Sequence, residues 1–304
     1  MAPATSSLFV ETSTDMSRAD ATKRISVKTL VESHGLTSIP WNYSYSTNPN
    51  ECAASNPEED TFPIIDFSLL TSADPHQRSK TIQDLDRACR EWGFFMLVNH
   101  GVSERLMKEV LEGCKEFFNL PAEEKMEYAG RDIWQPIRFG TGVDVKVEKF
   151  FFWRDFLKVI VHPQFHFPNK PKGFSEVARE YCKSTREVTT ELLKGISKGL
   201  GLEECYIEKK MNFDTGFQLF AILSNGRYKS LSHRAVVNNT ATRISIAAPH
   251  GPSLETAVGP APELVDGESG HPAVYMPMKF KDYLERLLEG RPCSLDHVRV
   301  PVAE

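Results

Sequence analysis

The sequence of 304 residues lacks several features that would place a protein in a narrow class. Its six cysteines are scattered, and no two of them stand in a C-x-x-C pair. This pattern suggests neither a zinc ribbon nor a disulfide framework, so buried, reduced thiols are expected. The longest apolar run near the N-terminus, Leu8-Phe9-Val10, is too short for a signal-peptide core or a membrane span.

The chain also lacks a large excess of charge of either sign. Its net charge is −5 and its pI is about 6.0, which favours neither a nucleic-acid partner nor a membrane surface. The first 25 residues are rich in Ser and Thr and faintly resemble a transit peptide. Glu11, Asp15 and Asp20 argue against that interpretation, so a cytoplasmic location is expected.

Periodicity divides the chain into three stretches. Residues 1–60 are expected to be a polar, disordered N-terminus and linker with one short helix near 26–35, followed by folded regions at 61–172 and 173–304. Apolar residues at helical spacing predict further helices at about 78–92, 104–118, 174–198 and 280–289, with a short one after Pro121. Ser103 is a suitable N-cap for the second of these, and Gly199 and Gly201 should end the third.

Short apolar runs predict the strands. Two strands are expected at about 62–67 and 94–100, the region 129–172 reads as strand and loop, and three more strands are expected at about 215–224, 231–237 and 243–249. Helices that come first, followed by short strands with turn residues between them, favour an α+β fold with a core built from strands.

Residues 230–245 contain the side chains that best form a candidate site. His233 ends a strand-like alternation, and Arg243 and Ser245 alternate across Ile244, so both would lie on one face of a strand. A guanidinium can bind a carboxylate through two hydrogen bonds, and a hydroxyl can add another. Taken alone, a single histidine is usually structural, and an Arg and a Ser two positions apart are usually surface residues.

Other histidines and aromatics have competing interpretations. His100 could be a metal ligand, but a strand-end histidine that is hydrogen-bonded at a turn is favoured. His162 and His166 could chelate a metal if they were helical, yet Pro163 and Pro168 oppose that geometry. The aromatic stretch Phe150–Phe156 could line a substrate pocket, although a place in the core is favoured.

Several longer motifs carry a family resemblance. They are Phe62-Pro-Ile-Ile-Asp-Phe, Trp92-Gly-Phe-Phe-Met-Leu-Val-Asn-His-Gly-Val, Ile222-Leu-Ser-Asn-Gly-Arg-Tyr-Lys-Ser, His233-Arg-Ala-Val-Val-Asn and Gly259-Pro-Ala-Pro-Glu-Leu. Together they resemble the plant Fe(II)/2-oxoglutarate-dependent dioxygenases, near flavanone 3-hydroxylase, hyoscyamine hydroxylase and the salicylate hydroxylases. The resemblance covers about 26–300.

The resemblance implies a fold and a chemistry. The fold would be a double-stranded β-helix, or jelly roll, with helices packed outside it. The cofactors would be Fe(II), 2-oxoglutarate and ascorbate, and the reaction would hydroxylate or desaturate a small plant metabolite such as a flavonoid, phenolic or alkaloid. His233 would bind the metal, and Arg243 and Ser245 would bind 2-oxoglutarate.

The sequence departs from the family at one place. The family supplies two further iron ligands as His-x-Asp, but none of the nine histidines here has an acidic residue two positions later. Ala221 runs directly into Ile222, where several tens of residues, including central strands of the jelly roll, are expected to be missing. Asp214 or Glu255 could replace the lost carboxylate only if the strands rearranged.

Two interpretations of activity therefore stand side by side. One is an iron oxygenase with impaired activity, and the other is a catalytically dead, truncated isoform or pseudoenzyme that at most binds a ligand. A metal-free scaffold that dimerises through its N-terminal helices is a third class, for which the sequence has no positive sign. A monomer with a small-molecule substrate, and with no nucleic-acid or membrane partner, is expected.

Overall fold

The computed structural model describes residues 26–34, 36, 38–40, 62–130, 132, 134–141, 152–211, 219–231, 233, 235, 241–266, 270–288 and 295–301. The predicted disordered segment 1–25 and the predicted linker at 45–61 lie outside these residues. In the described part, no helix has the length and apolar composition that crossing a membrane requires.

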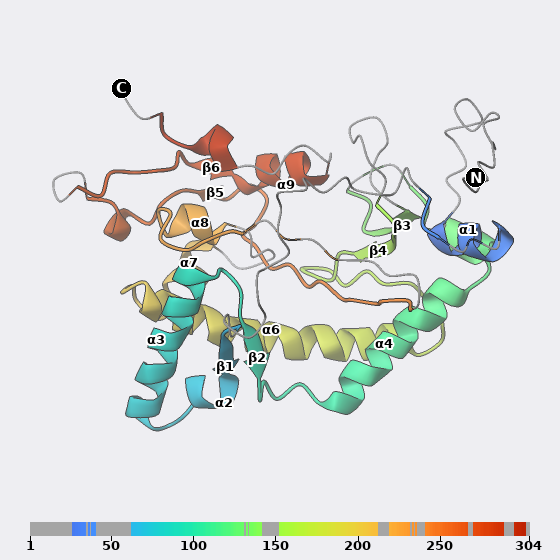
Figure 1. The fold of residues 1–304 in the computed structure, drawn as a ribbon, viewed down its shortest axis with the longest axis horizontal. Helices are drawn as coiled ribbons and strands as arrows, with labels where there is room; N and C mark the ends of the chain where they lie inside the picture. Colours follow the sequence, from blue (N-terminus) through green and yellow to red (C-terminus); the bar gives the residue numbers. More distant parts are fainter. Residues whose placement is uncertain are drawn as a thin grey trace, which may run out of the picture.

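Three long helices form the framework (Figure 1). Helix α6 (Phe174–Gly199) runs across the middle of the molecule, and α3 (Pro75–Glu91) and α4 (Glu104–Asn119) pack against it. The side chain of Asp74 accepts a hydrogen bond from the His76 amide at the start of α3, and Ser103 accepts one from the Leu106 amide at the start of α4. The predicted Ser103 cap is therefore confirmed.

Helix α6 ends as its glycines predict. Gly201 has φ +79°, its amide donates to the Lys198 carbonyl, and the Leu202 amide donates to the Ser197 carbonyl at 2.9 Å. These two bonds form a Schellman motif, which satisfies helix-end carbonyls and needs a left-handed residue at this position. The short helices α2 (Phe67–Leu70) and α7 (Tyr206–Met211) also pack against this framework.

A small parallel sheet lies beside the framework. Strand β1 (Ile64–Asp66) pairs with β2 (Met96–Val98), with Ile64 opposite Met96. Ile65 is 2% exposed and belongs to the larger core, whereas Ile64 and Met96 are 63% and 55% exposed. Successive side chains of a strand point to opposite faces, so one face of this sheet is covered by helices and the other is bare.

The antiparallel hairpin of β3 (Ile137–Thr141) and β4 (Asp155–Val159) packs against a second core. Phe117, Tyr128, Phe139 and Phe174 are its buried aromatics, and α5 (Ala122–Met126) lies between two of them in the chain. The Asp155 carboxylate accepts hydrogen bonds from the Val27 and Lys28 amides, which holds helix α1 (Val27–His34) against the hairpin.

The C-terminal part contains short elements. They are α8 (Phe220–Leu223), β5 (Ala257–Val258), η2 (Pro262–Leu264), β6 (Met278–Lys279), α9 (Phe280–Leu288) and η3 (Leu295–Val298). Strands β5 and β6 form a two-residue antiparallel pair. Ile222, Val258, Phe280 and Tyr283 are buried here and join the same larger core as α3 and α6.

The structure is α+β, as predicted, but the strands predicted for its C-terminal half are wrong where they can be compared. Residues 220–223 within the predicted strand 215–224 are helical, and 243–249 have no regular secondary structure. Leu219–Leu223 is a continuous apolar run, and such a run is compatible with either a buried helix or a buried strand. Each sheet in the described part has two strands, so an assembled jelly roll is not present there.

Candidate functional site

His233 lies on the surface, beside the link between α3 and β2. Its imidazole meets the Phe94 ring edge-on, with centroids 4.8 Å apart and planes at 85°. Its Nδ1 lies 3.1 Å from the Leu231 carbonyl oxygen, and a carbonyl only accepts, so this nitrogen carries the proton. The Nε2 lone pair is then the one available to a metal or a proton.

Arg243 and Ser245 lie together, as the alternation predicted. The Arg243 Nη1 donates to the Ser245 hydroxyl oxygen at 3.2 Å, and both residues are exposed while Ile244 between them is half-buried. They belong to the irregular segment 241–250 and not to a strand. A guanidinium whose partner in the described part is one hydroxyl retains donors for a carboxylate ligand.

The residues that the structure describes do not fit an iron centre. A two-histidine, one-carboxylate site needs three side chains on one face of the metal. In the described part of the chain, no three His, Cys, Asp or Glu side chains gather closely enough to hold a metal ion. Glu255 is engaged by Lys279 at 2.9 Å, an interaction that lowers the pKa of its carboxyl, and Asp214 lies outside the described residues.

The motif at 222–229 connects this region to the framework. A Schellman motif ends α8: the Gly226 amide donates to the Ala221 carbonyl at 2.8 Å and the Asn225 amide to the Ile222 carbonyl at 3.0 Å. Asn225 has φ +52°, and its side chain accepts from the Val274 amide and donates to the Pro272 carbonyl. The motif therefore builds a turn that holds the C-terminal segment.

Asp86 on α3 is the buried polar centre of this connection. Its Oδ1 accepts hydrogen bonds from Arg227 and Tyr228, both at 2.9 Å, and its Oδ2 pairs with Arg90 at 2.9 Å. Arg227 also donates to the Gly199 carbonyl at the end of α6. Burial and the Asp86 charge hold the pKa of Tyr228 well above its usual range, so Tyr228 acts as a hydrogen-bond donor.

Sequence reasoning missed the contributions of Asp86 and Phe94. Asp86 stands next to Leu85 on the apolar side of a predicted helix. A carboxylate at such a position is expected to be buried and therefore to need polar partners, which is the signal that could have identified it. Phe94 was placed in a strand but not near His233. The two lie far apart in the sequence, and nothing in either segment's periodicity brings them together.

A glycine lets the motif approach the N-terminal region. Gly93 has φ +67°, and a Cβ atom there would lie 2.6 Å from the Lys229 carbonyl oxygen. The Lys229 amide donates to the Cys89 carbonyl at 3.1 Å, so the backbone after the motif lies against the end of α3. Any side chain at position 93 would push this segment away.

The other candidate histidines follow their structural interpretations. The His100 Nδ1 accepts a hydrogen bond from the Val102 amide at 3.2 Å, within a turn where Asn99 and Gly101 have positive φ. His162 and His166 lie in an irregular segment, so the helical chelate is absent there, as the prolines predicted. His166 donates its amide to the Ile160 carbonyl.

Two members of the aromatic stretch, Phe152 and Phe156, lie outside both hydrophobic cores. Phe152 is 45% exposed, and the Arg154 guanidinium lies 5.0 Å from its ring centre. Phe156 is half-buried, with the Arg138 guanidinium 5.3 Å from its ring. The favoured core placement is therefore wrong for these two residues, while Phe150 and Phe151 lie outside the described part.

Comparison with known proteins identifies the family. Residues 62–179 match the family model described as non-haem dioxygenase in morphine synthesis, N-terminal. 2-oxoglutarate-dependent dioxygenase 19 of Oryza sativa subsp. japonica is 32% identical over 78% of this chain and 90% of its own length. This chain belongs to the 2-oxoglutarate-dependent dioxygenase family.

Further dioxygenases agree with this assignment. Flavanone 3-dioxygenase 3 of the same rice is 30% identical over 74% of this chain and 88% of its own length. The crystal structure of JOX2 in complex with 2OG, Fe and JA superposes with a TM-score of 0.75 at 23% identity, covering 92% of this chain and 98% of that one. This last likeness shows that the chain has the fold of 2-oxoglutarate oxygenases, in a form with few and short sheets.

Proposed function

We propose that this dioxygenase-family chain is an impaired member that does not assemble the family's iron centre. By family, its reaction would use Fe(II), 2-oxoglutarate and ascorbate to hydroxylate or desaturate a small plant metabolite such as a flavonoid, phenolic or alkaloid. The observation that carries the proposal is the ligand set. His233 has an oriented imidazole, and in the described part of the chain it does not belong to any group of three His, Cys, Asp or Glu side chains that could hold a metal ion.

The lengths of the alignments support an internal deletion. The alignment with the rice dioxygenase 19 is 305 positions long, but it contains only 78% of this 304-residue chain. Roughly 70 of its positions are therefore gaps in this chain. Flavanone 3-dioxygenase 3 leaves a similar gap, with 293 residues aligned to 74% of this chain. We place the deletion between Ala221 and Ile222, where the family's His-x-Asp would otherwise stand.

The bare face of the β1–β2 sheet also supports this proposal. Ile64 and Met96 are opposite one another and are both largely exposed. Exposed apolar pairs of this kind are expected where a covering layer has been lost. We propose that the missing layer consisted of central strands of a jelly roll, that 61–172 and 173–304 are the two regions of the family fold, and that 1–60 precedes them.

Residue roles follow from this history. His233 is proposed as the surviving iron ligand, and Arg243 and Ser245 as the pair that would hold the distal carboxylate of 2-oxoglutarate. The JOX2 crystal contains 2OG, Fe and JA. For this chain we propose a small-molecule ligand of similar size, a monomeric state and a cytoplasmic location, without nucleic-acid or membrane partners.

The alternative is an enzyme that remains active. Its support is the 32% identity to the rice dioxygenase, in an alignment that spans 90% of that protein's length. Activity would then need a new carboxylate, such as Glu255 or Asp214, beside His233.

Succinate formation tests both proposals. The full chain is assayed with Fe(II), ascorbate, 2-oxoglutarate and candidate substrates, with His233→Ala as the matched control. We expect the two proteins to form succinate at the same background rate. Turnover of the natural chain clearly above that of His233→Ala would contradict the proposal and establish the active enzyme.

The coding DNA supplies an independent test of the deletion. We expect an intron between the codons for Ala221 and Ile222 that contains an in-frame His-x-Asp, which would make this chain a splicing variant of an active gene. Uninterrupted coding DNA at that point would contradict the splicing origin and leave a deletion in the gene itself.

A further inference from the structure

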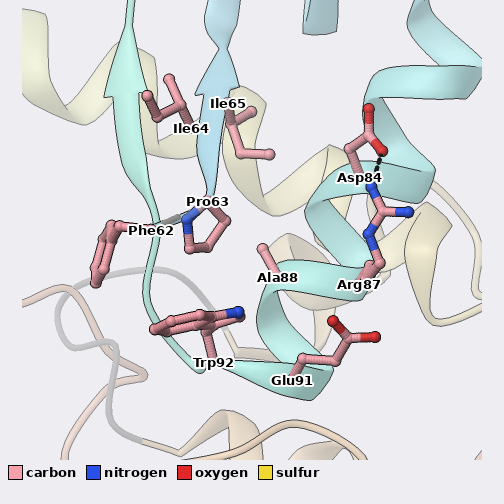
Figure 2. Close-up of a pocket in the computed structure, with 9 residues that line it drawn as sticks. All are labelled: Phe62, Pro63, Ile64, Ile65, Asp84, Arg87, Ala88, Glu91 and Trp92. Atoms are coloured by element: carbon pink, nitrogen blue, oxygen red, sulfur yellow. Dashed lines mark hydrogen bonds and ion pairs between the residues drawn. The ribbon is translucent and has the colours of Figure 1, made fainter. Parts of the chain in front are cut away.

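A pocket of about 500 Å³ lies between β1 and the C-terminal end of α3, and none of the candidate-site residues lines it (Figure 2). This volume is in the range of small-molecule sites. Phe62 and Trp92 form one wall, and Asp84, Arg87 and Glu91 lie on the other.

Helical spacing explains the charged wall. Counted from Asp84, the other helix residues of the pocket come three, four and seven positions later: Arg87, Ala88 and Glu91. At these spacings all four side chains share one face of α3. Ala88 is 3% exposed and lies between the charged residues and the aromatic wall in Figure 2. Its methyl group leaves space that a larger side chain would fill.

The aromatic wall offers ring surfaces to a ligand. The Phe62 and Trp92 rings are 5.7 Å apart at 63°, and Phe62 is 43% exposed. The faces of Trp and Phe carry negative electrostatic potential and attract cations within about 6 Å. This wall therefore suits a ligand that combines an apolar surface with positive charge.

The charged wall holds one carboxylate outside its internal ion pair. Asp84 and Arg87 form an ion pair with each other at 2.5 Å, and Figure 2 shows the guanidinium turned toward Asp84. The Glu91 carboxylate is exposed and has no ion-pair or hydrogen-bond partner among the described residues, while its backbone carbonyl accepts from Lys229. The Lys229 ammonium, 2.9 Å from the Glu91 carbonyl oxygen, already meets the negative end of the α3 dipole, so the Glu91 carboxylate is the group left to a ligand cation.

We infer that this pocket binds a small organic ammonium ion, with the cation over the Trp92 ring and beside the Glu91 carboxylate. An anionic ligand would meet Glu91 and an arginine already paired with Asp84. An extended peptide would gain little from the β1 edge, because that strand has three residues. The inference does not depend on iron or on 2-oxoglutarate.

Choline and its uncharged isostere, 3,3-dimethylbutan-1-ol, test the inference on the full chain. The readout is the indole N–H signal of Trp92 by NMR, assigned among the four tryptophans with Trp92→Phe. We expect choline to shift this signal saturably and the isostere to leave it in place. A response that is absent, or equal for the two probes, would overturn the inference.

Matched variants separate the site from general charge effects. Glu91→Gln should weaken choline binding by about threefold, the size of one exposed ion pair. Glu116→Gln removes the same charge from an exposed position on α4 and should leave binding unchanged. Equal choline affinities of the two variants would overturn the inference. So would a lysine-containing peptide that binds when choline does not.

Discussion

The helical framework and the C-terminal part of the chain differ in what completes their backbone hydrogen bonds. Helices α3, α4 and α6 have 17, 16 and 26 residues, whereas β5 and β6 have two residues each. A helix satisfies its backbone groups within itself, but a strand needs a neighbouring strand. Under the proposed internal deletion, the helices would remain formed and the remaining strands would lose partners.

The two parts are nevertheless joined through one buried cluster. Asp86 on α3 accepts hydrogen bonds from Arg227 and Tyr228, which come directly after α8. In the segment 241–250, Arg243 and Ser245 are both exposed and hydrogen-bond to each other. The comparison predicts that mutations in the framework and in the cluster destabilise the protein and that mutations at the candidate site do not.

The largest effect is expected in the framework core. Phe117 on α4 is fully buried among Phe118, Tyr128 and Phe139. Phe117→Ala should lower the free energy of unfolding by about 3–5 kcal/mol, because it removes a large apolar side chain and leaves a cavity. Urea denaturation followed by circular dichroism measures the change. A loss below about 1 kcal/mol would mean that the second core is not packed as described.

Cys89 reports on the same framework through its ionisation. Burial raises the pKa of this thiol from 9.0 to about 12, with a smaller contribution from Asp86. Three pH units correspond to roughly a thousandfold less thiolate at pH 8, so alkylation of Cys89 should be slower by about that factor in the native protein than in urea. Peptide mass spectrometry measures both rates, and comparable rates would contradict a closed core.

The raised pKa of Cys89 also sets the direction of a pH effect. Above pH 9 the thiol ionises in the unfolded chain before it ionises in the folded one, so the unfolded state binds fewer protons. Stability should therefore fall as pH rises from about 9 toward 12. The loss of stability over this pH range should be smaller in Cys89→Ala. If the free energy of unfolding falls equally with pH in both proteins, groups other than Cys89 cause the loss.

The Asp86 cluster should give an intermediate effect. Asp86→Ala leaves the Arg227 guanidinium and the Tyr228 hydroxyl without their buried acceptor, which should cost about 2–4 kcal/mol. Asp84→Asn on the same helix breaks an exposed ion pair and should change stability by less than about 1 kcal/mol. Similar losses in the two variants would show that Asp86 does not connect the two parts.

The smallest effect is expected at the candidate cosubstrate pair. Arg243→Ala should change the free energy of unfolding by no more than about 0.5 kcal/mol, because both Arg243 and Ser245 are exposed. Thermal unfolding with and without 2-oxoglutarate measures stability and binding in one experiment. A loss above about 1 kcal/mol would place Arg243 in the packed structure and weaken its assignment as a ligand-binding residue.

Sequence reasoning was most reliable where structure is local. The helices α3, α4, α6 and α9, the Ser103 cap and the Gly201 end could all be read from periodicity and capping residues, because each depends on neighbours within a few positions. The hydrogen-bonded turn at His100 followed for the same reason. These features need no knowledge of the rest of the chain.

The strands predicted at 62–67 and 94–100 are confirmed as β1 and β2, but those predicted at 215–224 and 243–249 are wrong where described, because a strand is defined by its partners. Leu219–Leu223 is apolar throughout and carries no period that separates a buried helix from a buried strand. Residues 243–246 alternate between polar and apolar side chains, but within the described part of the chain no strand pairs with them. Pairing of Arg243 with Ser245 was predictable from alternation, whereas the contact of His233 with Phe94 depends on tertiary structure.

Anaerobic titration of the full chain with Fe(II) in the presence of 2-oxoglutarate tests the central claim most directly. Isothermal calorimetry of the natural chain and of His233→Ala measures whether a specific iron site exists. Because no ligand set is assembled among the described residues, we expect the same weak, non-stoichiometric heat for both proteins. One equivalent of Fe(II) bound by the natural chain, and lost in His233→Ala, would contradict the claim that this dioxygenase cannot assemble its iron centre.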